Sequence, residues 1–234
     1  MKAHYSVLFA DADNTLFDFN RAEAHAFDIA MREFSITPDE ELCARYHEIN
    51  ASLWKALERG ETTQPKLRID RFRLLMEAYN LNIDPVAIAT CYTDYLAQGA
   101  FLLPEALECV QRWSRKVPVY LVTNGISDVQ RSRLARSQIK PYITDIIISQ
   151  EVGTQKPDPK MMEAALAVAG HPDKHEVLML GDSLSSDILG AINAGLDSCY
   201  FNPKGTPNTS NIVPTYEIRS LREVDALLGL ADEV

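Results

Sequence analysis

The sequence has few cysteines, and their positions exclude two common kinds of site. The 234 residues include four cysteines, at positions 43, 91, 109 and 199, and no two of them form a C-x-x-C pair. Such scattered cysteines are typical of buried thiols in a reducing compartment. His171 and His175 are four residues apart, but Pro172 and Asp173 between them favour a loop over a zinc-binding helix. We therefore expect neither a disulfide framework nor a zinc site.

Long apolar runs and an excess of basic residues are also missing. No run is long enough for a membrane span, and Met1–Tyr5 lacks the apolar core of a signal peptide. Lys and Arg number 23 against 33 Asp and Glu, a formal net charge of -10. This charge argues against nonspecific binding to nucleic acid or to anionic membranes. We expect a cytoplasmic protein with neither partner, in which a phosphorylated ligand requires a metal or local positive charge. The oligomeric state stays open.

The first part of the chain combines one short strand with a long helical region. The apolar run Val7–Ala10 predicts a fully buried strand. The sequence Thr37-Pro38-Asp39-Glu40 has the form of a capping box, and Asp84-Pro85 is typical of a helix start. Helices are predicted over residues 21–34, 67–79 and 85–96, and a further helix is predicted to run from the capping box toward residue 57.

From residue 104 onward, predicted strands and helices alternate. Strands are predicted over 117–123, 144–149, 177–181, 198–202 and 215–218, and helices over 105–116, 127–137, 157–169, 185–194 and after Ser220–Glu223. Such alternation favours a doubly wound parallel sheet with helices on both faces. The predicted fold class is α/β, with a core domain of residues 1–16 and 99–234 and an inserted helical cap domain of residues 17–98.

Two aspartates follow the first predicted strand. Asp11 and Asp13 lie at the carboxyl end of this strand, where open parallel sheets place their active sites. Residues at i and i+2 of an extended chain point to the same side, so both carboxylates can face one reacting atom. A hard cation such as Mg²⁺ relieves their repulsion and leaves one as a nucleophile and the other as an acid/base. The alternative is an acidic turn.

Three further motifs stand at the ends of predicted strands or the starts of helices. Thr123 and Asn124 are placed to bind a phosphate oxygen, or else form an ordinary strand-to-helix turn. Lys156 offsets negative charge if it lies near Asp11, although a lysine before a helix is more often exposed. Asp182 and Asp187 are suitable partners for a hard cation, with helix capping as the alternative for Asp187.

In their order, these four motifs resemble those of the haloacid dehalogenase-like phosphohydrolase superfamily. The helical insertion after the first motif is similar to this superfamily's small helical C1 cap. The resemblance implies a Rossmann-like core and an enzyme that hydrolyses phosphate monoesters. An acid at Asp13 favours a phosphatase over a haloacid dehalogenase, which lacks an acid at that place.

The same resemblance implies a role for each motif residue. Asp11 would be the nucleophile that becomes an aspartyl phosphate, and Asp13 would protonate the leaving alcohol and then activate water. Thr123 would hold the transferring phosphoryl group, and Lys156 would pair with Asp11 and the phosphate. The Mg²⁺ ligands would be the Asp11 and Asp182 side chains, the Asp13 backbone carbonyl and, through water, Asp187.

A narrower resemblance points to pyrimidine 5′-nucleotidases, which hydrolyse nucleoside 5′-monophosphates such as UMP, dUMP and dTMP. It is carried by Leu16–Phe19, Asn50, Leu53–Trp54, Gly60, Arg71–Phe72 and Ser149–Gly153. Phe19 and Trp54 are candidates for stacking on the base, with packing as the alternative. The basic residues of two segments are expected to form solvated helix faces: Lys66, Arg68, Arg71 and Arg73, and Arg131, Arg133 and Arg136.

The predicted function is that of a Mg²⁺-dependent phosphomonoesterase acting on a small phosphorylated metabolite, specifically a pyrimidine nucleoside monophosphate. The alternatives within enzymes are a sugar-phosphate phosphatase and a β-phosphoglucomutase-like transferase. A non-catalytic binding protein on the same fold would have lost the nucleophile, the acid or a metal carboxylate. Asp11, Asp13, Lys156 and Asp182 are all present.

Overall fold

The computed structural model describes residues 5–230 and divides the chain into two compact units. The first comprises residues 1–19 and 100–234, and the second comprises residues 20–99. The sequence-based boundaries lie after residue 16 and before residue 99. Residues 1–4, part of the segment expected to lack a signal peptide, lie outside the described residues, as do 231–234. Within residues 5–230, no helix combines the length and apolar character that a membrane span requires.

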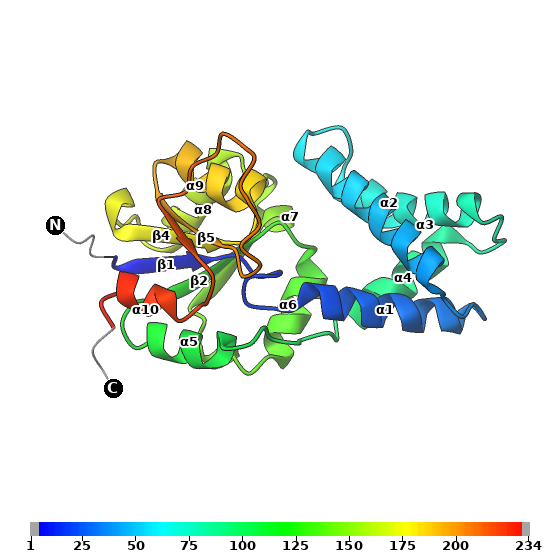
Figure 1. Ribbon diagram of the computed structural model, residues 1–234, viewed down its shortest axis with the longest axis horizontal. Coiled ribbons are helices and arrows are strands. Elements are labelled where there is room, and N and C mark those ends of the chain that lie inside the picture. Colours follow the sequence, from blue (N-terminus) through cyan, green and yellow to red (C-terminus); the bar gives the residue numbers. More distant parts are fainter. Residues whose placement is uncertain (1–4, 231–234) are drawn as a thin grey trace. The chain divides into compact units, whose positions relative to one another are not determined.

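The first unit contains a sheet of six parallel strands (Figure 1). Their order in space is β3-β2-β1-β4-β5-β6, and every neighbouring pair runs in the same direction. The central strands are buried on both faces, because their runs are almost entirely apolar. The strands are β1 (Val7–Ala10), β2 (Val119–Thr123), β3 (Asp145–Ile148), β4 (Val177–Gly181), β5 (Asp197–Phe201) and β6 (Tyr216–Ile218).

Helices pack on both faces of this sheet. Leu8 and Ala10 of β1 lie in one core cluster with α5 (Ala106–Trp113), α6 (Ser127–Arg136) and α10 (Glu223–Leu227). Val7 and Phe9 lie in a second cluster with α8 (Pro159–Val168) and α9 (Leu189–Ala194). Alternate residues of a strand face opposite sides of the sheet, so one apolar run contributes side chains to both core clusters. The predicted doubly wound α/β fold is confirmed. Short helices complete the unit: η1 (Lys140–Tyr142), α7 (Ser149–Val152), η2 (Lys174–Glu176) and the π-helix η3 (Leu184–Ile188).

The second unit is built from helices. These are α1 (Phe19–Glu33, whose first residue belongs to the first unit), α2 (Glu40–Glu58), α3 (Gln64–Ala78) and α4 (Pro85–Leu96). The Asp84 side chain accepts a hydrogen bond from the Val86 N–H at 3.0 Å, so the predicted start of α4 is confirmed.

The predicted Thr37 capping box is wrong. Helix α2 begins at Glu40, and the Asp39 carboxylate accepts a bond from the Leu42 N–H at 2.8 Å. Asp39 therefore is the N-cap, and Pro38 lies before the helix instead of in its first turn. A carboxylate satisfies the free N–H groups and the positive dipole end of a helix together, so Asp39 is the better cap.

The strand order determines where a site forms. β1 lies between β2 and β4, and the chain crosses from one half of the sheet to the other between β3 and β4. Open parallel sheets bind ligands at the carboxyl ends of the strands beside such a crossing. The residues that follow β1, β2 and β4 therefore lie together at this edge.

Candidate active site

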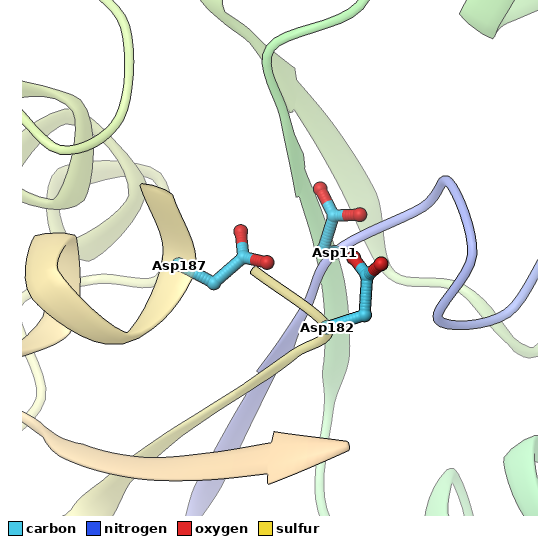
Figure 2. Close-up of side chains that lie close together, drawn as sticks. All are labelled: Asp11, Asp182 and Asp187. Atoms are coloured by element: carbon cyan, nitrogen blue, oxygen red, sulfur yellow. The ribbon is translucent and has the colours of Figure 1, made fainter. Parts of the chain in front are cut away.

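Asp11 is fixed directly beyond the end of β1. Its backbone N–H donates to the Leu180 carbonyl of β4 at 2.8 Å, which continues the ladder by one residue. Asp182 follows the end of β4, and Asp187 lies in η3. Figure 2 shows the carboxyl groups of Asp11 and Asp182 close together, with that of Asp187 turned toward them. One ligand oxygen from each carboxylate lies within 4.8 Å of the others.

The lysine expected near Asp11 is there. The Lys156 ammonium donates to Asp11 Oδ1 at 2.5 Å, to Asp187 Oδ1 at 2.6 Å and to the Val122 carbonyl at 2.7 Å. It is 1% exposed, so these bonds replace its water shell. With all three carboxylates ionised, they and the Lys156 ammonium carry two net negative charges, which a divalent cation would balance.

The pKa values of these groups reflect the charge imbalance. Burial and the carboxylates of Asp187 and Asp13 outweigh Lys156 and raise the pKa of Asp11 to about 7. Burial, Asp187 and Asp11 likewise hold the pKa of Asp182 well above its usual value. Burial alone would lower the pKa of Lys156, but Asp11 and Asp187 raise it. Lys156 alone therefore does not balance the negative charge of the acidic cluster. The hard oxygen donors of the cluster fit a cation such as Mg²⁺.

Asp187 is held by the turn after β4. Its Oδ2 accepts a bond from the Ser183 N–H at 3.0 Å, and its other oxygen meets Lys156. A Cβ at residue 181 would overlap the Asp187 carboxyl group, so this position requires glycine. The wide π-helical turn of η3 is a form often found at functional sites.

The side chain of Asn124 forms hydrogen bonds with the backbone of Lys156. Its Oδ1 accepts from the Lys156 N–H at 2.8 Å, and its Nδ2 donates to the Lys156 carbonyl at 2.9 Å and to Ser186 Oγ at 3.2 Å. The sequence predicted that Asn124 binds phosphate, and this stays a prediction; in the structure its amide holds the backbone of Lys156. Thr123 is buried and its hydroxyl accepts from the Gly125 N–H at 3.1 Å. A hydroxyl that accepts one bond keeps a proton to donate, so this contact is compatible with phosphate binding.

Asp13 has separate partners on α6. Its Oδ2 accepts from Gln130 Nε2 at 2.6 Å, and its Oδ1 forms an ion pair with the Arg133 guanidinium. Arg133 is fully buried, so the expectation that it forms part of a solvated face is wrong. Arg131, paired with Glu151, and Arg136 are exposed as expected. Asn14 adopts a left-handed φ of 60° in the turn after Asp13, a conformation that asparagine tolerates well.

The predicted base-stacking residues lie in different units. Phe19 begins α1 in the first unit, with the Arg133 guanidinium 5.9 Å from its ring centre. Trp54 is a half-buried residue of α2 in the second unit. Arg71 is 1% exposed and lies over the Tyr92 ring at 4.4 Å, so it is not part of a solvated face either.

Gln130 and Arg133 are site residues that the sequence analysis missed. The available signal was their i, i+3 spacing on one helix, which puts both side chains on one face close after Thr123.

Comparisons with known proteins agree with this geometry. The family model for haloacid dehalogenase-like hydrolases matches residues 5–195. The pyrimidine 5′-nucleotidase YjjG of Escherichia coli is 34% identical over 221 residues, covering 94% of this chain and 96% of YjjG. The pyrimidine 5′-nucleotidase PynA of Streptococcus pneumoniae is 35% identical, covering 94% of this chain and 93% of PynA.

A solved structure is similar over nearly the full length. The magnesium-bound HAD-hydrolase YfnB of Bacillus subtilis superposes with a TM-score of 0.91 at 34% identity, covering 96% of this chain and 99% of YfnB. The family match extends over more than half of the chain, and the relatives are similar over almost all of it. The resemblance found in the sequence motifs is thereby confirmed, and the chain belongs to the haloacid dehalogenase-like hydrolase family.

Proposed function

We propose that the protein is a Mg²⁺-dependent phosphomonoesterase that acts through an aspartyl phosphate on pyrimidine nucleoside 5′-monophosphates. The observation that carries the proposal is the surroundings of Asp11. Its carboxylate is held by Lys156 beside Asp182 and Asp187, with two negative charges left to be balanced. Phosphoryl transfer depends mainly on positioning and charge neutralisation, and this arrangement supports both.

The magnesium ligands would be the side chains of Asp11 and Asp182, the backbone carbonyl of Asp13 and, through water, Asp187. The indirect role of Asp187 agrees with its two existing bonds to Lys156 and Ser183. When bound, Mg²⁺ would balance the charge of the phosphate oxygens and favour the ionised form of Asp11.

The chain's own residues would carry the two half-reactions. An Asp11 oxygen attacks phosphorus, the bond from phosphorus to the ester oxygen breaks, and Asp13 gives that oxygen a proton. Water then attacks the phosphorus of the aspartyl phosphate, Asp13 takes its proton, and Asp11 is released with inorganic phosphate. Lys156 and the Thr123 hydroxyl would donate to the phosphoryl oxygens throughout.

The nucleotide preference is supported by the relatives YjjG and PynA, whose names specify pyrimidine 5′-nucleotidases. In this proposal Phe19 and Trp54 stack on the base. The competing substrates are sugar phosphates, and a β-phosphoglucomutase-like transferase would in addition have to protect its aspartyl phosphate from water.

The test is release of inorganic phosphate from a panel of substrates in the presence of Mg²⁺. The panel contains UMP, dUMP, dTMP, purine monophosphates, sugar phosphates and β-glucose 1-phosphate. We expect the highest kcat/KM with the pyrimidine nucleotides. A preference for sugar phosphates would refute the substrate assignment and leave the chemistry intact.

Asp11→Asn tests the chemistry itself. This variant should release no phosphate, while its circular dichroism spectrum matches that of the wild type. Substantial turnover by Asp11→Asn would overturn the covalent mechanism, and no release by the wild type with Mg²⁺ bound would favour a mutase or a binding protein.

A further inference from the structure

Two buried side chains of α6 contact the carboxyl group of Asp13, one at each of its two oxygens. Gln130 Nε2 donates to Oδ2 at 2.6 Å, and the Arg133 guanidinium pairs with Oδ1. Gln130 is 2% exposed and Arg133 is fully buried, whereas 24% of the Asp13 side chain is exposed. Both donors come from one helix face, and they approach from the protein interior.

The surrounding chain leaves space for this arrangement. A Cβ at residue 125 would overlap the Gln130 side chain, so Gly125 allows Gln130 to pass toward Asp13. The Arg133 guanidinium lies over the ring of Phe17 at 4.8 Å from its centre and is 5.9 Å from that of Phe19. Cation–π contacts of this kind orient the guanidinium plane as well as attract its charge.

Stability does not explain the arrangement. A buried ion pair adds little net stability, because removing both charges from water costs about as much as their attraction returns. Each carboxyl oxygen has a further lone-pair site. Bonds to Gln130 and Arg133 therefore fix the rotation of the Asp13 carboxyl group and leave positions on it for a proton and a substrate.

We propose that Gln130 and Arg133 are positioning residues that orient Asp13 for proton transfer to the leaving oxygen of the substrate. This inference rests on the proposed role of Asp13 as acid and base. Proton transfer requires a donor within hydrogen-bond reach of the ester oxygen. Without the bond from Gln130 or Arg133, the Asp13 carboxyl group can rotate. It then spends a smaller fraction of time within hydrogen-bond reach of the ester oxygen.

The loss of activity caused by replacing Gln130 or Arg133 should depend on the leaving group of the substrate. An alkoxide needs a proton as it departs, but the nitrophenolate of p-nitrophenyl phosphate is stable without one. The ratio kcat/KM reports the steps up to departure of the leaving group, which is the step that Asp13 assists. Poorer orientation of Asp13 should therefore reduce kcat/KM for alkyl esters and largely spare the nitrophenyl ester.

The experiment compares Gln130→Met and Arg133→Met with Arg136→Met, a matched control at an exposed arginine of the same helix. Substrates are p-nitrophenyl phosphate and whichever alkyl phosphate the panel shows to be best. Because general acid catalysis contributes about 10²–10⁴-fold, we expect a loss of about 10–100-fold for the alkyl ester. The loss for the nitrophenyl ester should be far smaller, and Arg136→Met should match the wild type on both.

A double-mutant cycle with Asp13→Asn completes the test. If Arg133 acts through Asp13, adding Arg133→Met to Asp13→Asn causes no further loss of kcat/KM for the alkyl ester. Equal losses on both substrates, or additive losses in the cycle, would refute the inference. Gln130→Met provides the same comparison if Arg133→Met fails to fold. If Asp13→Asn itself spares the alkyl ester, the proposed acid role fails first, and the two failures remain distinguishable.

Discussion

Replacing Asp11, the proposed nucleophile, should stabilise the metal-free protein, and the gain should grow with pH. In Asp11→Asn the buried carboxyl group becomes a neutral amide of the same size, and Lys156 keeps its bonds to Asp187 and Val122. In the wild type, burial and neighbouring carboxylates raise the pKa of Asp11 from 3.8 to about 7. The folded state therefore holds this proton more tightly than the unfolded state does.

The sign and size of the effect follow from proton linkage. A carboxyl group whose pKa is raised by folding lowers stability as pH rises through the interval between the two pKa values. Here that interval runs from 3.8 to about 7. Each unit of pKa shift corresponds to 1.36 kcal/mol, so ionising Asp11 in the folded state lowers the free energy of unfolding by about 4 kcal/mol at most. Asp182 and Asp187 take part in the same repulsion. We expect the variant to gain on the order of a few kcal/mol over the wild type between pH 5 and pH 8.

The assay is urea unfolding of both proteins in a chelator at several pH values, repeated with saturating Mg²⁺. The difference in the free energy of unfolding should increase with pH in the chelator and diminish with Mg²⁺, because in the proposed mechanism Mg²⁺ binds and stabilises the wild type. Asp128→Asn, at an exposed aspartate of α6, should differ from the wild type at pH 8 far less than Asp11→Asn does, because an exposed side chain contributes little to stability. A difference for Asp11→Asn that stays constant or falls with pH would show that Lys156 already outweighs burial and the other carboxylates.

Three further substitutions test the site. Gly181→Ala should reduce the Mg²⁺-dependent rise in Tm, because its Cβ displaces the Asp187 carboxyl group, which is proposed to bind the ion through water; an unchanged rise would contradict the ligand set. Asn124→Ala should lower stability by about 1–3 kcal/mol in urea unfolding, since the buried backbone groups of Lys156 lose their partners, and should reduce kcat at saturating Mg²⁺. Trp54→Ala should raise KM for UMP and leave KM for p-nitrophenyl phosphate unchanged; equal effects on both would exclude base stacking.

The sequence predicted well which residues of the candidate site lie together, because most of them follow directly on strands. The apolar runs of β1, β2 and β4 are short and unambiguous, so the polar residues following them had to meet at one edge once the sheet was parallel. Helix starts were less certain. At α2 the sequence analysis placed the capping box at Thr37, and only the backbone geometry shows that Asp39, two residues later, is the cap.

The two arginines wrongly expected to lie on solvated helix faces, Arg133 and Arg71, were misplaced for one physical reason. Charge makes a helix residue look solvent-exposed, and that reasoning fails when the partner comes from a distant part of the sequence. Arg133 pairs with Asp13 across 120 positions, and Arg71 lies against Tyr92 and Asn50 inside the second unit. Buried arginines depend on such long-range partners, which no local pattern records.

The same limit applies to the two aspartates themselves. By spacing alone, Asp11 and Asp13 are equivalent carboxylates facing one atom. In the structure the two aspartates differ in their contacts. Asp11 lies beside the acidic residues that follow β4 and pairs with Lys156, whereas Asp13 contacts an amide and a guanidinium group from α6. An oxygen beside a cation site is suited to attack phosphorus, and a carboxyl group held outside that cluster is free to exchange a proton with the leaving group or water. In the proposed mechanism, the division of labour between the two aspartates therefore depends on β4 and α6, elements far along the chain, and not on the aspartate pair itself.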